Sequence, residues 1–178
     1  MSVSELWIGT KRRRFELFRN AKLAYEDFFD QNGSKFQLLE PTSKELAITD
    51  RRLIDALTWY EEALELCLAE KAFRDAAVTL LQMGKLYRLW CRASEARALF
   101  ERALEIADSL PSLNNSELGL LAQCCSHIGI VALLNGDAEL GRRHIGRSVA
   151  ILEFCFDAEA NNLCLAAMEL PMRHHKGC

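Results

Sequence analysis

Three seven-residue segments with a similar pattern recur at spacings of 40 and 45 residues. They read YEEALEL at 60–66, FERALEI at 100–106 and IGRSVAI at 145–151. In each of them apolar residues lie three or four positions apart, which is the period of one face of an α-helix. A helical unit that repeats in this way cannot bury its apolar face alone, so successive units are expected to stack. The recurrence therefore predicts a fold built from similar helical units.

The remainder of the chain also has helical periodicity. Only three prolines and nine glycines occur among the 178 residues, which favours long helices over a fold with many turns. No segment alternates apolar and polar residues for long enough to predict a strand. The sequence thus predicts an all-α protein of about seven helices. They are expected over residues 12–30, 44–70, 74–90, 94–109, 117–134, 138–156 and 158–170.

The chain is long enough for one well-buried core, so a single domain over 1–178 is expected. Gly33 and Pro41 predict an early loop, after which Ser43 is expected to cap the second helix, with Glu45 in its first turn. The expected parts of the domain are a divergent first helix pair in 1–72 with its loop near 31–43, a repeat in 73–110, a second repeat in 115–156 and a capping helix in 158–170.

One helix pair has a recognisable pattern of small and aromatic residues. Its members are separated by 3, 9, 4 and 3 residues, and they are Gly84, Tyr87, Ala96, Phe100 and Ala103. This pattern resembles the tetratricopeptide repeat, in which the first helix has a small residue and a tyrosine and the second has an aromatic residue between two alanines. The resemblance implies a right-handed solenoid of helical hairpins that binds other proteins.

Two further copies of the pattern are less complete. The following copy keeps Gly129, Gly141, Ile145 and Ser148 at matching intervals. An earlier copy keeps only its second half, through Ala56, Tyr60 and Ala63. Because the spacings exceed the length of about 34 residues that is usual in the family, the repeats look most like those of kinesin light chains and related adaptors.

Small residues predict close contacts within the helix pairs. Gly84 is expected to face Ala96, and Gly129 is expected to face Gly141, because two helices approach closely only where side-chain bulk is missing. Phe100 is then expected to fill the space between neighbouring hairpins. The first helix of the earliest pair has no motif, and residues 12–30 are assigned to it because a partner helix is needed.

In tetratricopeptide proteins the first helix of each hairpin lines a concave groove that receives an extended peptide or a partner helix. The resemblance maps this groove onto Val78, Leu81, Lys85, Arg88, Leu89, Gln123, Ser126, Ile130 and Leu133. Lys85 and Arg88 lie one turn apart on an otherwise apolar face, which suits an amphipathic partner with acidic side chains. The alternative is that this face belongs to the core and the two cations are solvated. The subclass that grips a C-terminal carboxylate is rejected, because Leu81, Lys85 and His127 stand where its clamp would be.

Two other functions stay open. The chain could be an architectural subunit that assembles or self-associates through the ends of its stack, since a short array leaves apolar edges. It could also be a basic adaptor for nucleic acid or acidic membranes, through Lys11 to Arg14 and the cationic residues of the sixth helix. A net charge of −3 gives no reason to expect nucleic acid as a partner. The cationic residues of the sixth helix are Arg142, Arg143, His144 and Arg147.

Cysteine usage indicates a reducing compartment. The seven cysteines are odd in number and form no CxxC pair, so buried free thiols in the cytoplasm, or the nucleus, are expected. The adjacent Cys124 and Cys125 are expected to be small core residues. The tail HHKGC at 174–178 has His174, His175 and Cys178 but no fourth ligand, so neither a metal nor a cofactor is expected.

The sequence favours a protein that is not an enzyme. It contains no glycine-rich phosphate loop, no nucleophile elbow and no HExxH motif, and Cys91 has no evident base near it. No apolar stretch is expected to approach the roughly 18 residues that span a bilayer. A membrane-spanning segment is therefore not expected.

Overall fold

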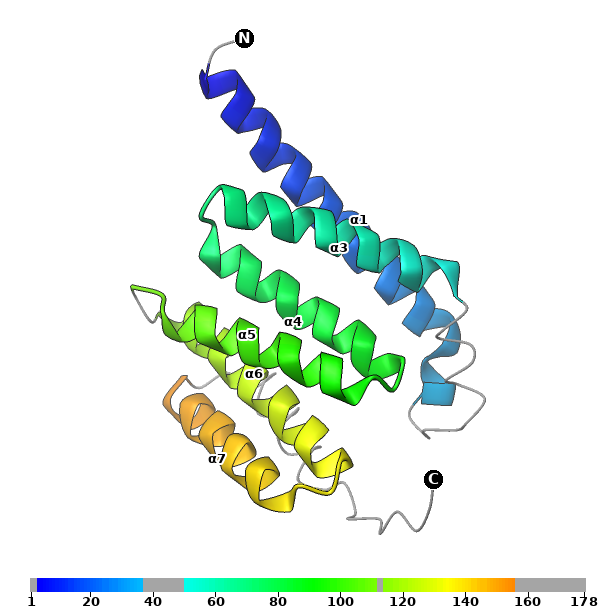
Figure 1. The fold of residues 1–178 in the computed structure, drawn as a ribbon, viewed down its shortest axis with the longest axis vertical. Coiled ribbons are helices and arrows are strands. Elements are labelled where there is room, and N and C mark those ends of the chain that lie inside the picture. The colour runs from blue at the N-terminus through cyan, green and yellow to red at the C-terminus, as the bar shows by residue number, and fades with distance from the viewer. Residues whose placement is uncertain (1–2, 37–49, 112–113, 156–178) are drawn as a thin grey trace. The chain divides into compact units, whose positions relative to one another are not determined.

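The described part of the chain consists of helices joined by short turns. The computed structural model describes residues 3–36, 50–111 and 114–155, and no strand occurs within these ranges (Figure 1). Their helices are α1 (Val3–Phe36), α3 (Arg51–Ala69), α4 (Phe73–Leu89), α5 (Ala93–Asp108), α6 (Asn115–Leu134) and α7 (Ala138–Cys155). The all-α prediction is confirmed, and four helices agree with the predicted ranges to within two residues at each end. The predicted helix at 158–170 lies outside the described residues.

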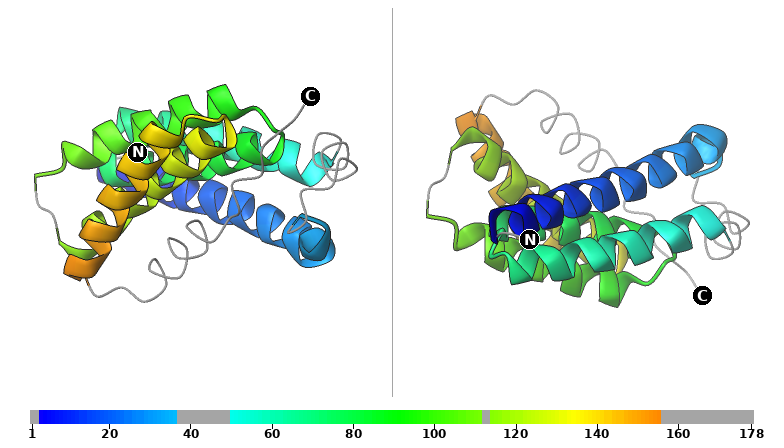
Figure 2. Two further views of the ribbon diagram at one scale, coloured as in Figure 1. Left: turned by 90° about the horizontal axis from the view of Figure 1, so that it is seen from below. Right: turned by 90° about the horizontal axis from the view of Figure 1, so that it is seen from above.

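The chain divides into two compact units, Met1–Ile106 and Ala107–Cys178. In the first unit, α1 packs against α3 and α3 packs against α4, with neighbouring helices side by side (Figures 1 and 2). In the second unit, α6 packs along α7. The α1–α3 and α6–α7 pairs correspond to predicted helix pairs, whereas α3 and α4 belong to successive predicted pairs. The single-domain organisation stays a prediction.

The first helix is longer than the sequence suggested. α1 continues through residues 31–36, where a loop was predicted because of Gly33. That part of the prediction was wrong. One glycine costs a helix interior only about 1 kcal/mol relative to alanine, which is too little to end a helix of 34 residues.

The second described helix begins later than predicted. Asp50 has extended backbone angles, and its side chain accepts a hydrogen bond from the backbone N–H of Arg52 at 2.9 Å, so Asp50 is the N-cap and α3 begins at Arg51. The Arg52 guanidinium also donates to Asp50 at 2.6 Å, and this hydrogen bonding lowers the pKa of the Asp50 carboxyl. A continuous helix over 44–70 was therefore wrong, while Ser43 and Glu45 lie outside the described residues.

The close contact between α4 and α5 exists, and it involves Gly84 and Phe100. A Cβ atom placed on Gly84 would lie 2.4 Å from the Phe100 ring, so Gly84 makes room for Phe100. Ala96 and Phe100 are both fully buried. The expected contact of Gly84 with Ala96 stays a prediction. The ring of Phe100 lies flat against helix backbone that has no side chain of its own.

The corresponding contact between α6 and α7 is confirmed. A Cβ atom on Gly129 would lie 3.0 Å from the carbonyl oxygen of Gly141 and 2.7 Å from the side chain of Ile145. The buried Ser148 hydroxyl donates a hydrogen bond to the carbonyl oxygen of Ala122 at 2.8 Å, which joins the same two helices. The α6–α7 hairpin therefore has the small-residue contact that the second copy of the repeat pattern predicts.

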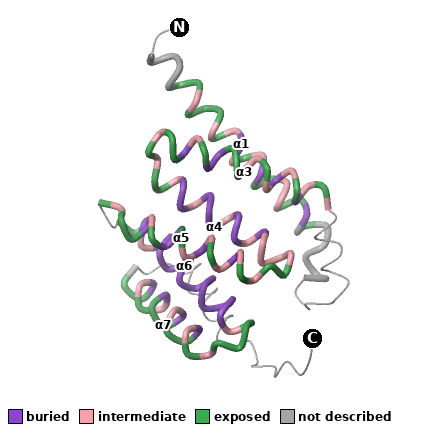
Figure 3. The backbone as a smooth tube through the Cα atoms, viewed as in Figure 1, coloured by how far each residue is buried: buried purple, intermediate pink, exposed green. Residues whose placement is uncertain are grey.

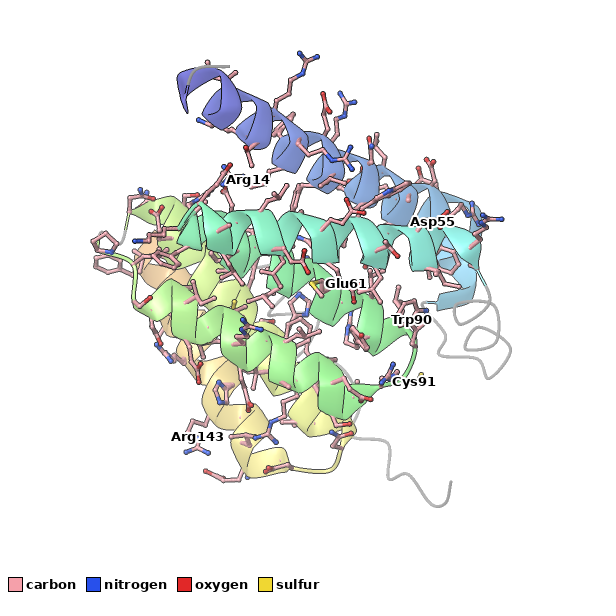
Figure 4. All side chains as sticks on the ribbon, turned by 45° about the horizontal axis from the view of Figure 1, so that its top comes forward. Arg14, Asp55, Glu61, Trp90, Cys91 and Arg143 are labelled. Carbon is pink, nitrogen blue, oxygen red and sulfur yellow. The ribbon has the colours of Figure 1, made fainter. Side chains whose placement is uncertain are left out.

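Three helix ends share one backbone device. Lys71, Cys91 and Gly136 have positive φ angles of 54°, 55° and 83° at the ends of α3, α4 and α6. In each case the backbone N–H of the following residue donates a hydrogen bond to the carbonyl oxygen five residues earlier. Arg92, for example, donates to the carbonyl oxygen of Tyr87 at 2.9 Å. This is the Schellman pattern, in which glycine is preferred at the left-handed position. Figure 4 shows Cys91 at the turn between α4 and α5.

We expect the Cys91→Gly variant to be more stable than the wild type. The left-handed conformation costs a residue with a Cβ atom roughly 1–2 kcal/mol, and the flexibility that glycine adds to the unfolded chain offsets part of that gain. The matched reverse change, Gly136→Ala, should destabilise, since its position also has positive φ. Urea unfolding followed by far-UV circular dichroism measures both. A loss of stability in Cys91→Gly would contradict the shared turn geometry.

The helix α6 corrects an expectation about membranes. Its residues Asn115–Leu134 are long and apolar enough to cross a bilayer by length and composition, contrary to the prediction that no stretch approaches that length. Within the structure, 78% of its most apolar window is buried, and Figure 3 shows buried positions along most of its turns. An apolar helix that is covered on most sides has the pattern of a core helix in a globular protein.

Candidate functional site

Two of the predicted partner-binding residues of α4, Val78 and Arg88, lie near α1. Val78, Lys85, Arg88 and Leu89 are partly exposed, whereas Leu81 is buried with 1% of its surface accessible. Val78 lines a pocket together with residues of α1, and the positive charge of Arg88 acts on Tyr25 of α1. Part of the α4 face selected from the family pattern therefore lies next to the first helix. Leu81 contributes to the interior.

The four predicted residues of α6 are more deeply placed. Gln123 and Leu133 are partly exposed, whereas Ser126 and Ile130 are buried. Ile130 packs with Ile145 of α7, and Leu133 packs against the same pair. The apolar members of this set therefore contact α7 of their own unit. A partner-binding role for the predicted residues of α4 and α6 stays a prediction.

A pocket of about 290 Å³ lies between α1, α3 and α4 in the first unit. Its walls combine apolar surface with cationic side chains and one carboxylate. The lining residues are Lys11, Arg14, Phe15, Phe18, Cys67, Arg74, Asp75, Val78 and Thr79. Only Val78 among them was selected from the sequence as a binding residue. We call this cavity the α1–α4 pocket.

The apolar wall of the α1–α4 pocket consists of an exposed ring and a fixed one. Phe15 is 67% exposed. Phe18 meets the buried Tyr60 of α3 edge-on, with ring centroids 5.5 Å apart and planes inclined at 67°. Edge-to-face pairs of this kind add about 0.5–1.5 kcal/mol beyond burial, so Phe18 is held in place. Phe15 remains accessible on the surface.

Arg14 joins the three helices that surround the pocket. Its guanidinium lies 2.8 Å from Glu70 at the end of α3 and 3.0 Å from Asp75 in the first turn of α4. The side chains of Arg14 and Glu70 are only 12% and 13% exposed. Figure 4 shows Arg14 between α1 and α3. The Arg14–Glu70–Asp75 ion-pair network therefore fixes the position of α1 on the α3–α4 hairpin.

Two tyrosines lie farther along the same helices. Burial raises the pKa of Tyr25 to about 12, although the nearby positive charge of Arg88 opposes this. Burial also raises the pKa of Tyr60 well above its usual range, with Tyr25 and Glu26 adding to the effect. Both phenols are therefore neutral at physiological pH.

The chemistry of the pocket suits binding. Burial, as the largest cause, raises the pKa of the Cys67 thiol, so this group is protonated at neutral pH and is a poor nucleophile. The Thr79 hydroxyl donates a hydrogen bond to the carbonyl oxygen of Asp75 at 2.7 Å. The lining contains no histidine that could act as a base for either group. Its side chains can contact an apolar group and pair with an anion.

The α1 side of this site was missed by sequence reasoning. Lys11, Phe15 and Phe18 follow one another at steps of four and three residues, so they share one face of α1. That stripe was a usable signal. It was not used because α1 has no family motif from which its rotation could be inferred.

The basic segments are largely paired with carboxylates of the chain itself. Besides Arg14, Arg12 lies 3.0 Å from Glu16, and Arg13 lies 3.2 Å from Glu62. These pairs neutralise much of the Lys11 to Arg14 run. The Lys11 to Arg14 run therefore does not form a strongly cationic surface that would favour a polyanion.

The cationic residues of α7 are also partly paired. Arg147 donates two hydrogen bonds to Asp108, at 2.8 and 3.1 Å, and this contact raises the pKa of Arg147. Arg142 lies 3.1 Å from Glu139. Arg143 is exposed, and Figure 4 shows it pointing outward from α7. The cationic residues of α7 therefore contribute less net positive charge to the surface than the sequence suggests.

Cys67, Cys91, Cys124 and Cys125 are free thiols, as predicted. Cys67, Cys124 and Cys125 are buried, and the adjacent pair consists of small core residues as expected. Cys91 is exposed, so the expectation of burial was wrong for this residue. No group of three metal-ligating side chains occurs among the described residues. The HHKGC tail lies outside that part of the chain.

Comparison with known proteins finds one family match, over the middle of the chain. Residues 45–109, a segment that includes α3, α4 and α5, match the family model described as Tetratricopeptide repeat, which supports the predicted repeat. Such repeats generally mediate protein–protein interaction. The narrower resemblance to kinesin light chains is not confirmed. No curated protein and no solved structure matches the chain significantly.

Proposed function

We propose that this chain is a noncatalytic adaptor or complex subunit of the cytoplasm that holds a peptide or an amphipathic helix of another protein. The observation that carries the proposal is the α1–α4 pocket, which lies beside a helix of the tetratricopeptide segment and includes Val78 of its predicted binding face. A hollow between helices is where protein side chains and small ligands are commonly bound.

The charges beside this face favour an acidic partner. Lys85 and Arg88 are partly exposed on α4, one turn apart and on the same side as Val78. An amphipathic segment could place apolar residues against Val78 and carboxylates near the two cations. The same helix face would then supply both parts of the recognition.

Charge reversal tests the proposal directly. The Lys85→Glu/Arg88→Glu variant and the wild type are used to capture partners from cell extract, and the captured proteins are compared by quantitative mass spectrometry. We expect proteins enriched by the wild type to be lost with the variant. Because Arg88 is partly buried, the single Lys85→Glu variant and circular dichroism serve as folding controls. Unchanged capture by well-folded variants would refute a role for this α4 face.

A second candidate function is assembly through the ends of the helix stack. It is favoured by apolar side chains in the first and last described helices, because Ile8 of α1 and Phe154 of α7 are mostly exposed. Under this alternative, Ile8→Ser/Phe154→Ser would abolish capture or self-association while the reversal of Lys85 and Arg88 would not. Sizing by light scattering distinguishes self-association from capture of another protein.

A further inference from the structure

We infer that the outward face of α1 is an interface between two copies of this chain, which pair their α1 helices side by side and antiparallel about a two-fold axis. The inference rests on the second candidate function, assembly through an end of the helix stack, and it names the partner and the contact. The α4 face with Lys85 and Arg88 plays no part in it.

Exposed apolar side chains form a row along α1. Ile8, Phe15 and Leu23 are 61%, 67% and 49% exposed. Their steps of seven and eight residues place them within about 80° around the helix, on the side opposite to the buried Leu17 and Ala21. Figure 1 shows the first turns of α1 extending past the end of α3. Single exposed apolar residues are common on protein surfaces, whereas a row on one helix face indicates an interaction site.

The charges beside this row change sign along the helix, and this order selects the partner. The exposed residues of the first half are mostly cationic, and those of the second half are anionic. They are Lys11, Arg12, Arg19 and Lys22, followed by Glu26, Asp27 and Asp30. Two antiparallel copies bring the cationic half of one helix opposite the anionic half of the other, whereas parallel copies would bring like charges together. The face is therefore complementary to itself in the antiparallel orientation.

One register satisfies the apolar and the charged residues together. With the two-fold axis at Arg19, Phe15 of one copy lies opposite Leu23 of the other, because both are four residues from the axis. Arg12 lies opposite Glu26, because both are seven residues from the axis. In an interface with two-fold symmetry each of these contacts occurs twice. A single register thus covers both exposed apolar residues and pairs opposite charges.

The ion pairs within α1 are compatible with this register. Arg12 lies 3.0 Å from Glu16, and Lys22 lies 3.5 Å from Glu26. All four side chains are at least 43% exposed, and each pair uses one oxygen of its carboxylate, so both glutamates can accept a second cation. The register places Glu16 opposite Lys22 of the other copy. Arg19 meets its own copy at the axis, where its long exposed side chain can turn towards Glu16 of the other chain.

Sedimentation velocity of the full chain, at concentrations from about 1 μM to 1 mM, tests the inference. A contact between two helix faces is small for a protein interface, so we expect a reversible dimer whose fraction rises with concentration. Phe15→Ala/Leu23→Ala should weaken dimerisation about tenfold or more. Because both side chains are mostly or half exposed, this variant should remain folded, which circular dichroism verifies.

Charge exchange tests the antiparallel register. Arg12→Glu and Glu26→Arg should each weaken dimerisation about tenfold, because each change places two pairs of like charges across the interface. The combined variant Arg12→Glu/Glu26→Arg restores opposite charges at both places and should return to within about threefold of the wild type. The matched control is Arg143→Glu at an exposed position of α7, which should stay within about twofold.

A chain that remains monomeric up to about 1 mM overturns the inference. Dimers that tolerate every α1 variant, or that weaken equally in the control, overturn it while assembly through another surface stands. A combined variant as weak as the single ones overturns the antiparallel register. If a monomeric chain captures another protein through Phe15 and Leu23, that protein occupies the face and the inference is again overturned. Capture that depends on Lys85 and Arg88 is measured separately, so the proposed adaptor function can stand in each of these cases.

Discussion

Replacing Phe100 with alanine is expected to lower the free energy of unfolding by about 3–5 kcal/mol. The Phe100 side chain is fully buried, and its ring lies against Gly84 of the neighbouring helix. Removing the ring leaves a cavity that rigid helix backbone cannot collapse to fill. Urea unfolding is followed by tryptophan fluorescence, which reports on the first unit because all three tryptophans lie before residue 107.

A double-mutant cycle isolates the contact between the two residues. Gly84→Leu alone should cost about 1–3 kcal/mol, because the new side chain must occupy the space of the Phe100 ring. In Gly84→Leu/Phe100→Ala the leucine can enter the vacated space, so the double variant should be more stable than the sum of the two losses predicts. A coupling of about 0.5 kcal/mol or more is expected for residues in contact. Strict additivity would contradict the packing of Phe100 on Gly84.

A milder change keeps this test usable if the double variant or Phe100→Ala fails to fold. Phe100→Leu retains most of the apolar volume and should cost less than the alanine variant. Its loss should again be reduced by a larger residue at position 84. The sign of the coupling is then measured on folded proteins.

The hairpins could be predicted from the sequence because small residues at fixed spacing leave few alternatives for packing. Gly129 and Gly141 do approach closely, as expected. The sequence could not specify which side chain occupies the space at Gly84, since Ala96 and Phe100 lie one turn apart on the same face of α5. Which of the two fills the space depends on the rotation of α5, and periodicity alone does not determine rotation that finely.

Single residues misled the prediction where tertiary packing outweighed local preference. Gly33 does not end α1. The apolar length of α6 was underestimated because its Gln123, Ser126 and His127 interrupt the apolar run, yet the last two are buried. Polar residues in a packed helix therefore do not by themselves indicate which side of the helix is exposed to solvent. Burial in that helix is set by its neighbours more than by its own pattern.

The candidate site was only partly predictable for a similar reason. The family pattern located the α4 face with Val78, but it carries no information on α1, which lies outside the matched segment. Lys11, Phe15 and Phe18 enter the site through the contact of α1 with the first hairpin. A row of residues at helical spacing shows which side chains share one face of a helix. Which cavity that face lines depends on the neighbouring helices against which the helix packs.

The ion pairs of Arg14 hold α1 on the first hairpin, and their removal is the second change with a large expected effect. Arg14→Ala is expected to lower the free energy of unfolding by about 3 kcal/mol. The Arg14 and Glu70 side chains are each less than one-seventh exposed, so removing the guanidinium leaves the Glu70 carboxylate largely buried without its cation. The matched control is Arg12→Ala, whose ion pair with Glu16 lies at the surface and should contribute little. Tryptophan fluorescence during urea unfolding measures both variants.

The double variant Arg14→Met/Glu70→Leu separates charge burial from simple loss of contact. Because it removes the buried carboxylate together with its partner, it should be more stable than Arg14→Ala and can approach the wild type. If it is as unstable as the sum of its single changes, Arg14 acts through packing of its aliphatic part and not through the Arg14–Glu70–Asp75 network. A recovery of stability without recovery of partner capture would show that the network also shapes the α1–α4 pocket, because Arg14 lines that pocket and pairs with Asp75 on its rim.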